Sequence, residues 1–203
     1  GKFDLLIDGE GSYDATKDDA VDGDSITATV PNGNVDLSEA AGTDTSLSDY
    51  TTTWSCVEAG SGPADQNGNG TSIADLPVGA GDEWTCTITN TRKKGQVTLI
   101  KDIVPVNGQL SDPGKFDLLI DGEGGYDASA DEAGDGGQVT LTVPNGTVDL
   151  SESADGETSL DDYTSAWSCF EQGEGPADLA GEGISIADLP VGAGDEWTCT
   201  ITN

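Results

Sequence analysis

The chain has 203 residues, which is enough for two domains of ordinary size but leaves little room for a large enzyme cleft. Its 39 acidic and 7 basic residues give a formal net charge of −32 at pH 7, which repels nucleic acids and anionic membrane surfaces. The sequence has no histidine to act as a general base and no apolar stretch of membrane-spanning length. We therefore expect no catalysis, no nucleic-acid binding and no membrane span.

The acidic surface predicts cations as partners, because counterions offset the repulsion among carboxylates. Lysine is scarce, methionine is absent and most of the acids are aspartate. This balance resembles that of halophilic proteins, with an ordinary acidic secreted protein as the alternative. The strand periodicity described next argues against a disordered chain.

The first predicted strand covers residues 3–7, where Phe3, Leu5 and Ile7 face the interior. Residues 14–24 are expected to form an acidic loop. Its carboxylates are either calcium ligands or, as we prefer, a solvated surface, and they belong to Asp18, Asp19, Asp22 and Asp24.

Residues 26–30 and 35–39 alternate in the same way on either side of Asn32-Gly33. This dipeptide between two alternating runs predicts a β-hairpin. Residues 40–50 are expected to form a loop that includes a short helical turn.

The rest of the first half contains short strands separated by glycine, proline and asparagine. We expect strands at residues 51–58, 71–76 and 83–90, a glycine-rich loop at 60–70 and a turn at 77–81. About seven short strands without helical periodicity predict an all-β fold, a prealbumin-like or immunoglobulin-like sandwich.

The glycine-rich loop contains a candidate calcium site at Asp65, Asn67 and Asn69, because alternating oxygen ligands followed by glycine resemble the start of a calcium loop. The closing glutamate of such loops is missing. A plain polar loop is the alternative, and calcium is the single cofactor for which the sequence offers any pattern.

One stretch, residues 91–113, occurs once, whereas most of the chain occurs twice. Val97, Leu99, Lys101 and Ile103 lie on one face and Thr98, Ile100 and Asp102 on the other, which predicts a strand with an inward lysine. Residues 92–95 are a short connection, so the modules are expected to be arranged in line with limited freedom. Their cluster Arg92, Lys93 and Lys94 is interpreted as an exposed linker.

The two copies are related by a constant offset of 113 residues, as residues 1–11 and 114–124 show. Residues 1–90 are predicted to be a first β-sandwich repeat that lacks its first strand. Residues 91–113 would be a linker plus the first strand of the second repeat, and residues 114–203 the remainder of that repeat. The strand missing from the first repeat would come from a longer array or from a neighbouring chain.

Each copy contains two cysteines separated by 30 residues, each in a Trp-x-Cys triplet. The spacing predicts one disulfide inside each module, Cys56–Cys86 and Cys169–Cys199. A zinc site is the weaker alternative, because the chain has no CxxC and no histidine. Disulfides imply an extracellular or cell-surface location.

Three patterns occur in a characteristic order: the strand that contains Lys101, residues 143–152, and residues 199–203. This order resembles the prealbumin-like repeat domains, of the collagen-adhesin B type, found in surface proteins and pili of bacteria or archaea. The resemblance implies an isopeptide bond between Lys101 and Asn203, promoted by Glu152. Its counterparts in the first repeat are Glu39 and Asn90, without a lysine.

Periodicity supports part of this assignment, because Lys101, Glu152 and Asn203 each share a strand face with apolar residues. Burial would favour a neutral amine beside a carboxylic acid, the states that the reaction needs. A Lys-Glu ion pair without a covalent bond is the alternative, and the disulfide makes a second cross-link less necessary.

The sequence therefore favours an extracellular structural repeat protein: a stalk or filament building block of a cell-surface fibre, not an enzyme, whose partners are copies of itself or further repeats. One alternative is a self-assembling pilus-like subunit completed by strand donation from a neighbouring chain. The other is an adhesin module that binds a glycan or protein ligand through its end loops.

Overall fold

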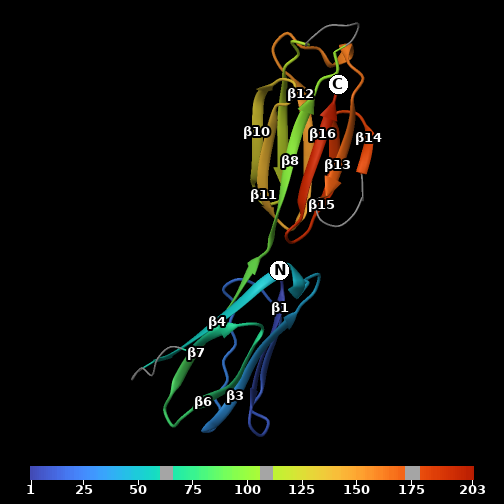
Figure 1. Cartoon of the computed structure of the whole chain (residues 1–203). Helices are drawn as coiled ribbons and strands as arrows, with labels where there is room; N and C mark the ends of the chain where they lie inside the picture. Colours follow the sequence, from blue (N-terminus) through green and yellow to red (C-terminus); the bar gives the residue numbers. More distant parts are fainter. Residues whose placement is uncertain (60–65, 106–111, 172–178) are drawn as a thin grey trace. The chain divides into compact units, whose positions relative to one another are not determined.

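The computed structural model describes residues 1–59, 66–105, 112–171 and 179–203, and the chain divides into two units (Figure 1). Unit 1 is Gly1–Arg92 and unit 2 is Lys93–Asn203. Strands dominate both units. No helix in the described residues is long and apolar enough to cross a membrane.

Unit 2 is a sandwich of two sheets (Figure 1). One sheet has the strand order β11-β8-β16-β13-β14 and the other has the order β10-β9-β12-β15. The strands are β8 (Lys94–Asp102), β9 (Phe116–Gly122), β10 (Tyr126–Ala133), β11 (Gln138–Pro144), β12 (Gly146–Ala154), β13 (Ala166–Glu171), β14 (Leu179–Glu182), β15 (Ser185–Val191) and β16 (Glu196–Thr202). A short 3-10 turn covers Leu160–Asp162.

The first and last strands of unit 2 are direct neighbours. Strand β8 pairs with β16 in parallel, which brings Val97 opposite Trp197, and it pairs antiparallel with β11 on its other side. Figure 1 shows β8 in green beside β16 in red. Because β8 is a central strand, its inward side chains Val97, Leu99 and Lys101 are fully buried.

Unit 1 has the same plan with fewer strands. Its sheets have the orders β2-β1-β3-β6 and β5-β4-β7. The strands are β1 (Phe3–Gly9), β2 (Ala15–Ala20), β3 (Gly33–Ala41), β4 (Tyr50–Ala59), β5 (Gln66–Asn69), β6 (Ser72–Val78) and β7 (Glu83–Arg92). A 3-10 turn covers Leu47–Asp49, where a helical turn was expected.

The two cores differ in burial although their sequences are nearly the same. Phe116, Leu118 and Ile120 of β9 have no exposed surface, whereas their counterparts on β1 are only partly buried. Unit 2 has β8 packed across β9, and the described part of unit 1 has no strand in that position. Full burial of such a side chain contributes about 1.5–3 kcal/mol, so the side chains of β1 contribute less hydrophobic stabilisation in the described structure than those of β9.

Three local expectations are wrong. Residues 15–20, expected in an acidic loop, form β2, an edge strand in which alternate side chains face solvent. The hairpin is not formed: in unit 2, β11 and β12 follow one another but belong to opposite sheets, and residues 25–31 of unit 1 form no strand. Residues 66–69, expected in a loop, form β5 and pair with β4.

The predicted all-β class and the sandwich architecture are confirmed. The strands that contain the Trp-x-Cys triplets and the single-copy strand lie where alternation placed them, as β4, β7, β13, β16 and β8.

Candidate functional site

A buried lysine lies at the centre of unit 2. Lys101 is on β8, and its side chain is fully buried on the same strand face as Val97 and Leu99. Its Nζ lies 4.6 Å from the centre of the Phe116 ring and donates a hydrogen bond of 2.9 Å to the carbonyl of Ile201. A cation over an aromatic face is stabilised by the ring quadrupole, so Phe116 offsets part of the cost of burial.

Glu152 of β12 reaches Lys101 from the opposite sheet. Its Oε2 lies 3.0 Å from Lys101 Nζ, which is ion-pair distance without hydrogen-bond geometry. Burial lowers the pKa of Lys101, and the contact with Glu152 opposes this shift. The amine is therefore easier to deprotonate than an exposed lysine, and the nearest acceptor for its proton is Glu152.

Asn203 completes the cluster at the end of β16. Its Nδ2 donates a 2.7 Å hydrogen bond to Glu152 Oε1, so one carboxylate contacts both the amine and the carboxamide. Its Oδ1 is buried and has no hydrogen-bond partner in the described part of the chain. The structure thus brings together Lys101, Glu152 and Asn203, the three residues that the resemblance singled out.

Unit 1 contains the same pair without the lysine. Asn90 Nδ2 donates a 2.8 Å hydrogen bond to Glu39 Oε2, and Thr52 donates one of 2.6 Å to Asn90 Oδ1. Burial raises the pKa of Glu39, although hydrogen bonds from Asn90 and Thr52 oppose the shift. Glu39 Oε1 is buried and has no hydrogen-bond partner among the described residues.

Each unit contains one disulfide. Cys56 is bonded to Cys86 and Cys169 to Cys199, and within each pair the cysteines lie directly opposite on neighbouring strands of one sheet. The pairing agrees with the spacing in the sequence. In unit 2 the disulfide joins β13 to β16, whereas the Lys-Glu-Asn cluster joins β8 and β12 to the end of β16, so the two features connect β16 to different strands.

The candidate calcium residues are only partly described. Asn67 and Asn69 lie on β5 with exposed side chains on one face, and Asp65 is outside the described residues. No group of three or more metal-binding side chains occurs in the described part of the chain. Calcium binding at this stretch stays a prediction.

Two carboxylates of the expected acidic loop have protein partners instead. Asp19 accepts a 2.7 Å hydrogen bond from the Thr43 backbone, and this bond lowers the pKa of Asp19. Asp24 forms a 2.8 Å ion pair with Lys17. Both carboxylates therefore hold segments of unit 1 together.

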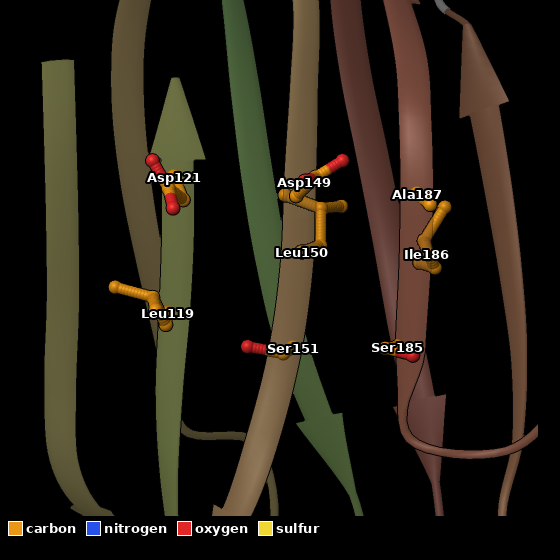
Figure 2. Close-up of a pocket in the computed structure, with 8 residues that line it drawn as sticks. All are labelled: Leu119, Asp121, Asp149, Leu150, Ser151, Ser185, Ile186 and Ala187. Atoms are coloured by element: carbon orange, nitrogen blue, oxygen red, sulfur yellow. The ribbon is translucent and has the colours of Figure 1, made fainter. Parts of the chain in front are cut away.

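A shallow depression lies on the solvent face of the β9-β12-β15 sheet (Figure 2). Asp121 and Asp149 lie opposite each other there, and Asp149 accepts a 2.7 Å hydrogen bond from the backbone N–H of Asp188. Asp188 has a φ of 52°, and the pairing register shifts beside it. Asp149 thus holds a β-bulge, and the same arrangement recurs in unit 1 at Asp36 and Asp75.

Sequence reasoning missed two groups at the cluster. Phe116 is the repeat counterpart of Phe3, which was expected to face the interior, but its place beside Lys101 was not predicted, because the sequence does not show which strand packs across which. Thr52 was not noticed, although it lies on the same face of its strand as Trp54 and Cys56, a signal that was available.

Comparisons with known proteins identify the family. A family model described as a prealbumin-like fold domain matches residues 10–92 and 97–203, which is nearly the whole chain. The chain belongs to the prealbumin-like fold domain family. No curated protein matches it.

Solved structures with the same prealbumin-like architecture include the major pilin from Streptococcus pyogenes, at 16% sequence identity and a TM-score of 0.51 over 100% of this chain and 90% of that one. A mutant of that pilin matches at 14% identity and a TM-score of 0.50, over 100% of this chain and 91% of that one. At these identities the likeness establishes the fold.

Proposed function

We propose that this chain is a load-bearing building block of an extracellular filament or stalk on a cell surface, and that Lys101 becomes covalently bonded to Asn203. Family membership and the pilin-like fold support the filament role. The observation that carries the proposal is the buried contact of Glu152 with both Lys101 and Asn203. A buried ion pair contributes little net stability by itself. Stability alone therefore does not explain why Lys101 and Glu152 are buried together.

The contacts outline the reaction. Lys101 Nζ transfers a proton to Glu152 Oε2, and the neutral amine attacks Cγ of Asn203, forming an Nζ–Cγ bond. Rotation of the Asn203 carboxamide would exchange the positions of its Nδ2 and Oδ1. Protonated Glu152 can then donate a hydrogen bond to Oδ1 and stabilise the charge that develops there. The Cγ–Nδ2 bond then breaks, and Nδ2 takes up the proton that Nζ loses and leaves as ammonia. No oxidant or cofactor is needed.

The position of the bond explains how it would serve a filament. Residue 101 lies near the end of the first strand of unit 2 and residue 203 follows its last strand, and these strands are parallel neighbours. A force that enters at β8 and leaves after Asn203 would pass through the Lys101–Asn203 bond. Residues 102–202 would carry no tension, so the module would not lengthen under load.

Intact mass tests the bond, and force spectroscopy tests its role. The chain should weigh one ammonia less than its sequence with two disulfides, and Asn203→Ala should abolish the loss. When pulled, unit 2 of the native chain should not extend. The Asn203→Ala unit should release residues 102–168 and 200–202, roughly 230–250 Å of chain, because the disulfide still shields the segment between its cysteines.

Asn90→Ala is the matched control, because it removes the corresponding amide from unit 1. It should leave both the mass loss and the inextensibility of unit 2 unchanged. An unmodified mass for the native chain would refute the covalent bond. Equal extension of unit 2 in the native and Asn203→Ala chains would refute the mechanical role.

A further inference from the structure

One sheet of unit 2 has a solvent face without charge at its centre. In the sheet β11-β8-β16-β13-β14, inward side chains such as Leu99 and Cys199 are buried, so the residues that alternate with them along each strand point to solvent. The pairing register places six of these outward residues in two rows: Thr140, Thr98, Thr198 and Phe170 in one row, and Ile100 and Thr200 in the next. We call these six residues the uncharged face.

Charge is confined to the margin of this surface. The acidic residues of the described strands that point to the same side are Asp102, Glu182 and Glu196, and each is the first or last residue of its strand. Threonine favours strands in general, but strand preference does not explain an uncharged centre in a chain of net charge −32. An uncharged centre with charge at the rim is typical of a protein–protein interface.

Phe170 is the largest apolar side chain of the uncharged face, and 48% of it is exposed. It lies on β13 directly opposite Thr198 of β16. Aromatic residues are common anchors of protein–protein interfaces, because their burial removes a large apolar area from water. The uncharged face therefore has a side chain suited to anchor a partner.

Three hydroxyl groups on this side of the sheet already have partners. The hydroxyls of Thr98 and Thr140 are joined by a hydrogen bond of 3.0 Å, and Thr202 donates one of 3.1 Å to Asp102. A hydroxyl that already has a partner loses few hydrogen bonds when it is buried. The surface is thus better suited to a dry contact with another protein than to a glycan, which needs free hydrogen-bonding groups in its site.

Unit 1 has the same kind of surface on its sheet β5-β4-β7. Its exposed side chains form cross-strand pairs without charge: Thr53–Thr89, Ser55–Thr87 and Val57–Thr85. Val57 is the repeat counterpart of Phe170, and 50% of it is exposed. The uncharged surface with one exposed apolar residue is therefore a property of the repeated module.

The opposite sheet of each unit has acids on its solvent face. In unit 2, Asp127, Asp121 and Asp149 lie side by side on three neighbouring strands. In unit 1, Asp8 lies opposite Asp36. Such rows of like charge repel any surface of the same sign. Two copies of this chain can therefore approach one another with least repulsion through their uncharged faces.

We propose that the uncharged face is a lateral interface on which a second copy of this chain docks face to face. The inference deepens the proposed function and rests on its filament role, because lateral docking would join neighbouring filaments, but it does not depend on the Lys101–Asn203 bond. Phe170 of one copy would pack against threonine methyl groups of the other. The acidic sheets would then point away from the contact, and the same surface would serve both copies about a two-fold axis.

The size and charge of the surface determine the strength of such a contact. Strands about 4.8 Å apart make a five-stranded sheet about 20 Å wide, so a single contact is at the small end of the range for interfaces and is weak. Modules in tandem would add their contacts along a filament. Because the net charge of −32 opposes the approach of two copies, added salt should strengthen the association, whereas it weakens an interface of opposite charges.

Static light scattering of the full chain over a concentration series tests the proposal at about 0.05 M and about 2 M NaCl, because the higher concentration screens the repulsion between acidic surfaces. We expect a monomer at low salt and reversible association at high salt. In NMR spectra at high salt, the methyl resonances of Thr98, Thr198 and Thr200 should shift with protein concentration. That of Thr147, on the solvent face of β12 in the opposite sheet, should stay fixed.

Two matched variants locate the contact. Phe170→Asp places a carboxylate on the uncharged face and should weaken association at high salt by at least ~10-fold, as the loss of an interface anchor does. Leu119→Asp is the control, because Leu119 is 40% exposed on the solvent face of the opposite sheet and the change adds the same charge. It should leave the association unchanged. Both side chains are exposed, so thermal unfolding should show that both variants are folded.

Three outcomes would overturn the proposal. The first is a chain that stays monomeric at both salt concentrations. The second is equal weakening by Phe170→Asp and Leu119→Asp, which would indicate non-specific association. The third is a set of methyl shifts on the uncharged face that appears only when hydroxyethyl cellulose, a soluble neutral glycan, is added. Mass and force measurements on single chains report the bond and the mechanical role of unit 2, so their failure is read separately from that of the lateral interface.

Discussion

Asn203 donates a 2.7 Å hydrogen bond to Glu152, so the carboxamide that reacts in the proposed step already contacts the carboxylate that would accept the proton of Lys101. The same relationship holds between Asn90 and Glu39 at 2.8 Å. The units therefore share the carboxylate and the carboxamide, and they differ in whether a lysine reaches the carboxylate. This difference makes each unit an internal control for the other.

Glu152→Gln should prevent the loss of ammonia in unit 2. Glutamine retains the size of the side chain, but it leaves Lys101 buried beside a group that accepts no proton. Breaking a buried pair by neutralising one partner costs about 3–5 kcal/mol, so the melting temperature of unit 2 should also fall. Intact mass and thermal unfolding measure the two effects.

Glu39→Gln is the control for that variant. It makes the same change in unit 1 and should leave the mass loss of the chain intact. Retention of the ammonia loss in Glu152→Gln would contradict the role assigned to this carboxylate.

Removal of the Cys56–Cys86 disulfide should destabilise its unit more than removal of Cys169–Cys199 destabilises unit 2. On the chain-entropy model a loop of this length contributes about 3–4 kcal/mol. A Lys101–Asn203 bond would already restrict the unfolded chain of unit 2, so less entropy remains for its disulfide to remove. Chemical denaturation of the two double Cys→Ala variants makes the comparison, and equal losses would argue against a pre-existing restraint.

Unit 1 should show a stability component that is lost as the pH rises. Burial raises the pKa of Glu39 in the folded unit above its value in the unfolded chain, so the folded state binds the proton more tightly. This component is fully present below the unfolded pKa, about 4.3, and is lost as the pH rises through the folded pKa. Glu39→Gln should remove it.

The measurement is the difference in unfolding free energy between native and Glu39→Gln chains from about pH 4 to pH 8. The difference cancels the general effect of the acidic surface, which both chains share. A pH-independent difference would show that Glu39 is not protonated preferentially in the folded unit.

Tyr163 should ionise only at strongly alkaline pH. Desolvation, together with the 2.7 Å hydrogen bond that its hydroxyl donates to Asp112, raises its pKa to about 12. Its stabilising contribution is present below about pH 10 and is lost as the pH rises towards 12. Ultraviolet titration should show one late tyrosinate that is absent in Tyr163→Phe and shifted to lower pH in Asp112→Asn.

The family resemblance singled out the cluster, and periodicity supported it because each of its residues shares a strand face with apolar residues. Lys101 shares a face with Val97 and Leu99, and a lysine on an apolar face is a conspicuous exception. The distances were not predictable, since they depend on the packing of β8 across β9 and on the position of Phe116. Which of the two explanations holds, an ion pair or a covalent bond, is a matter of chemistry that alternation does not address.

The errors have equally specific causes. Asn32-Gly33 was interpreted as a hairpin turn, but a turn sequence does not determine whether the following strand pairs with the preceding one or passes to the opposite sheet. Residues 15–20 were expected in a loop because they contain acids, whereas an edge strand exposes alternate side chains. In both places the structure of the segment depends on which sheet it joins, and local composition does not show this.

The parallel pairing of β8 with β16 has a consequence for survival outside the cell. If Lys101 is bonded to Asn203, residues 102–202 form a closed ring. A protease that cuts this ring once converts it into an open loop, but the polymer backbone on either side stays connected. A fibre built in this way would tolerate a nick in every such module and still not break.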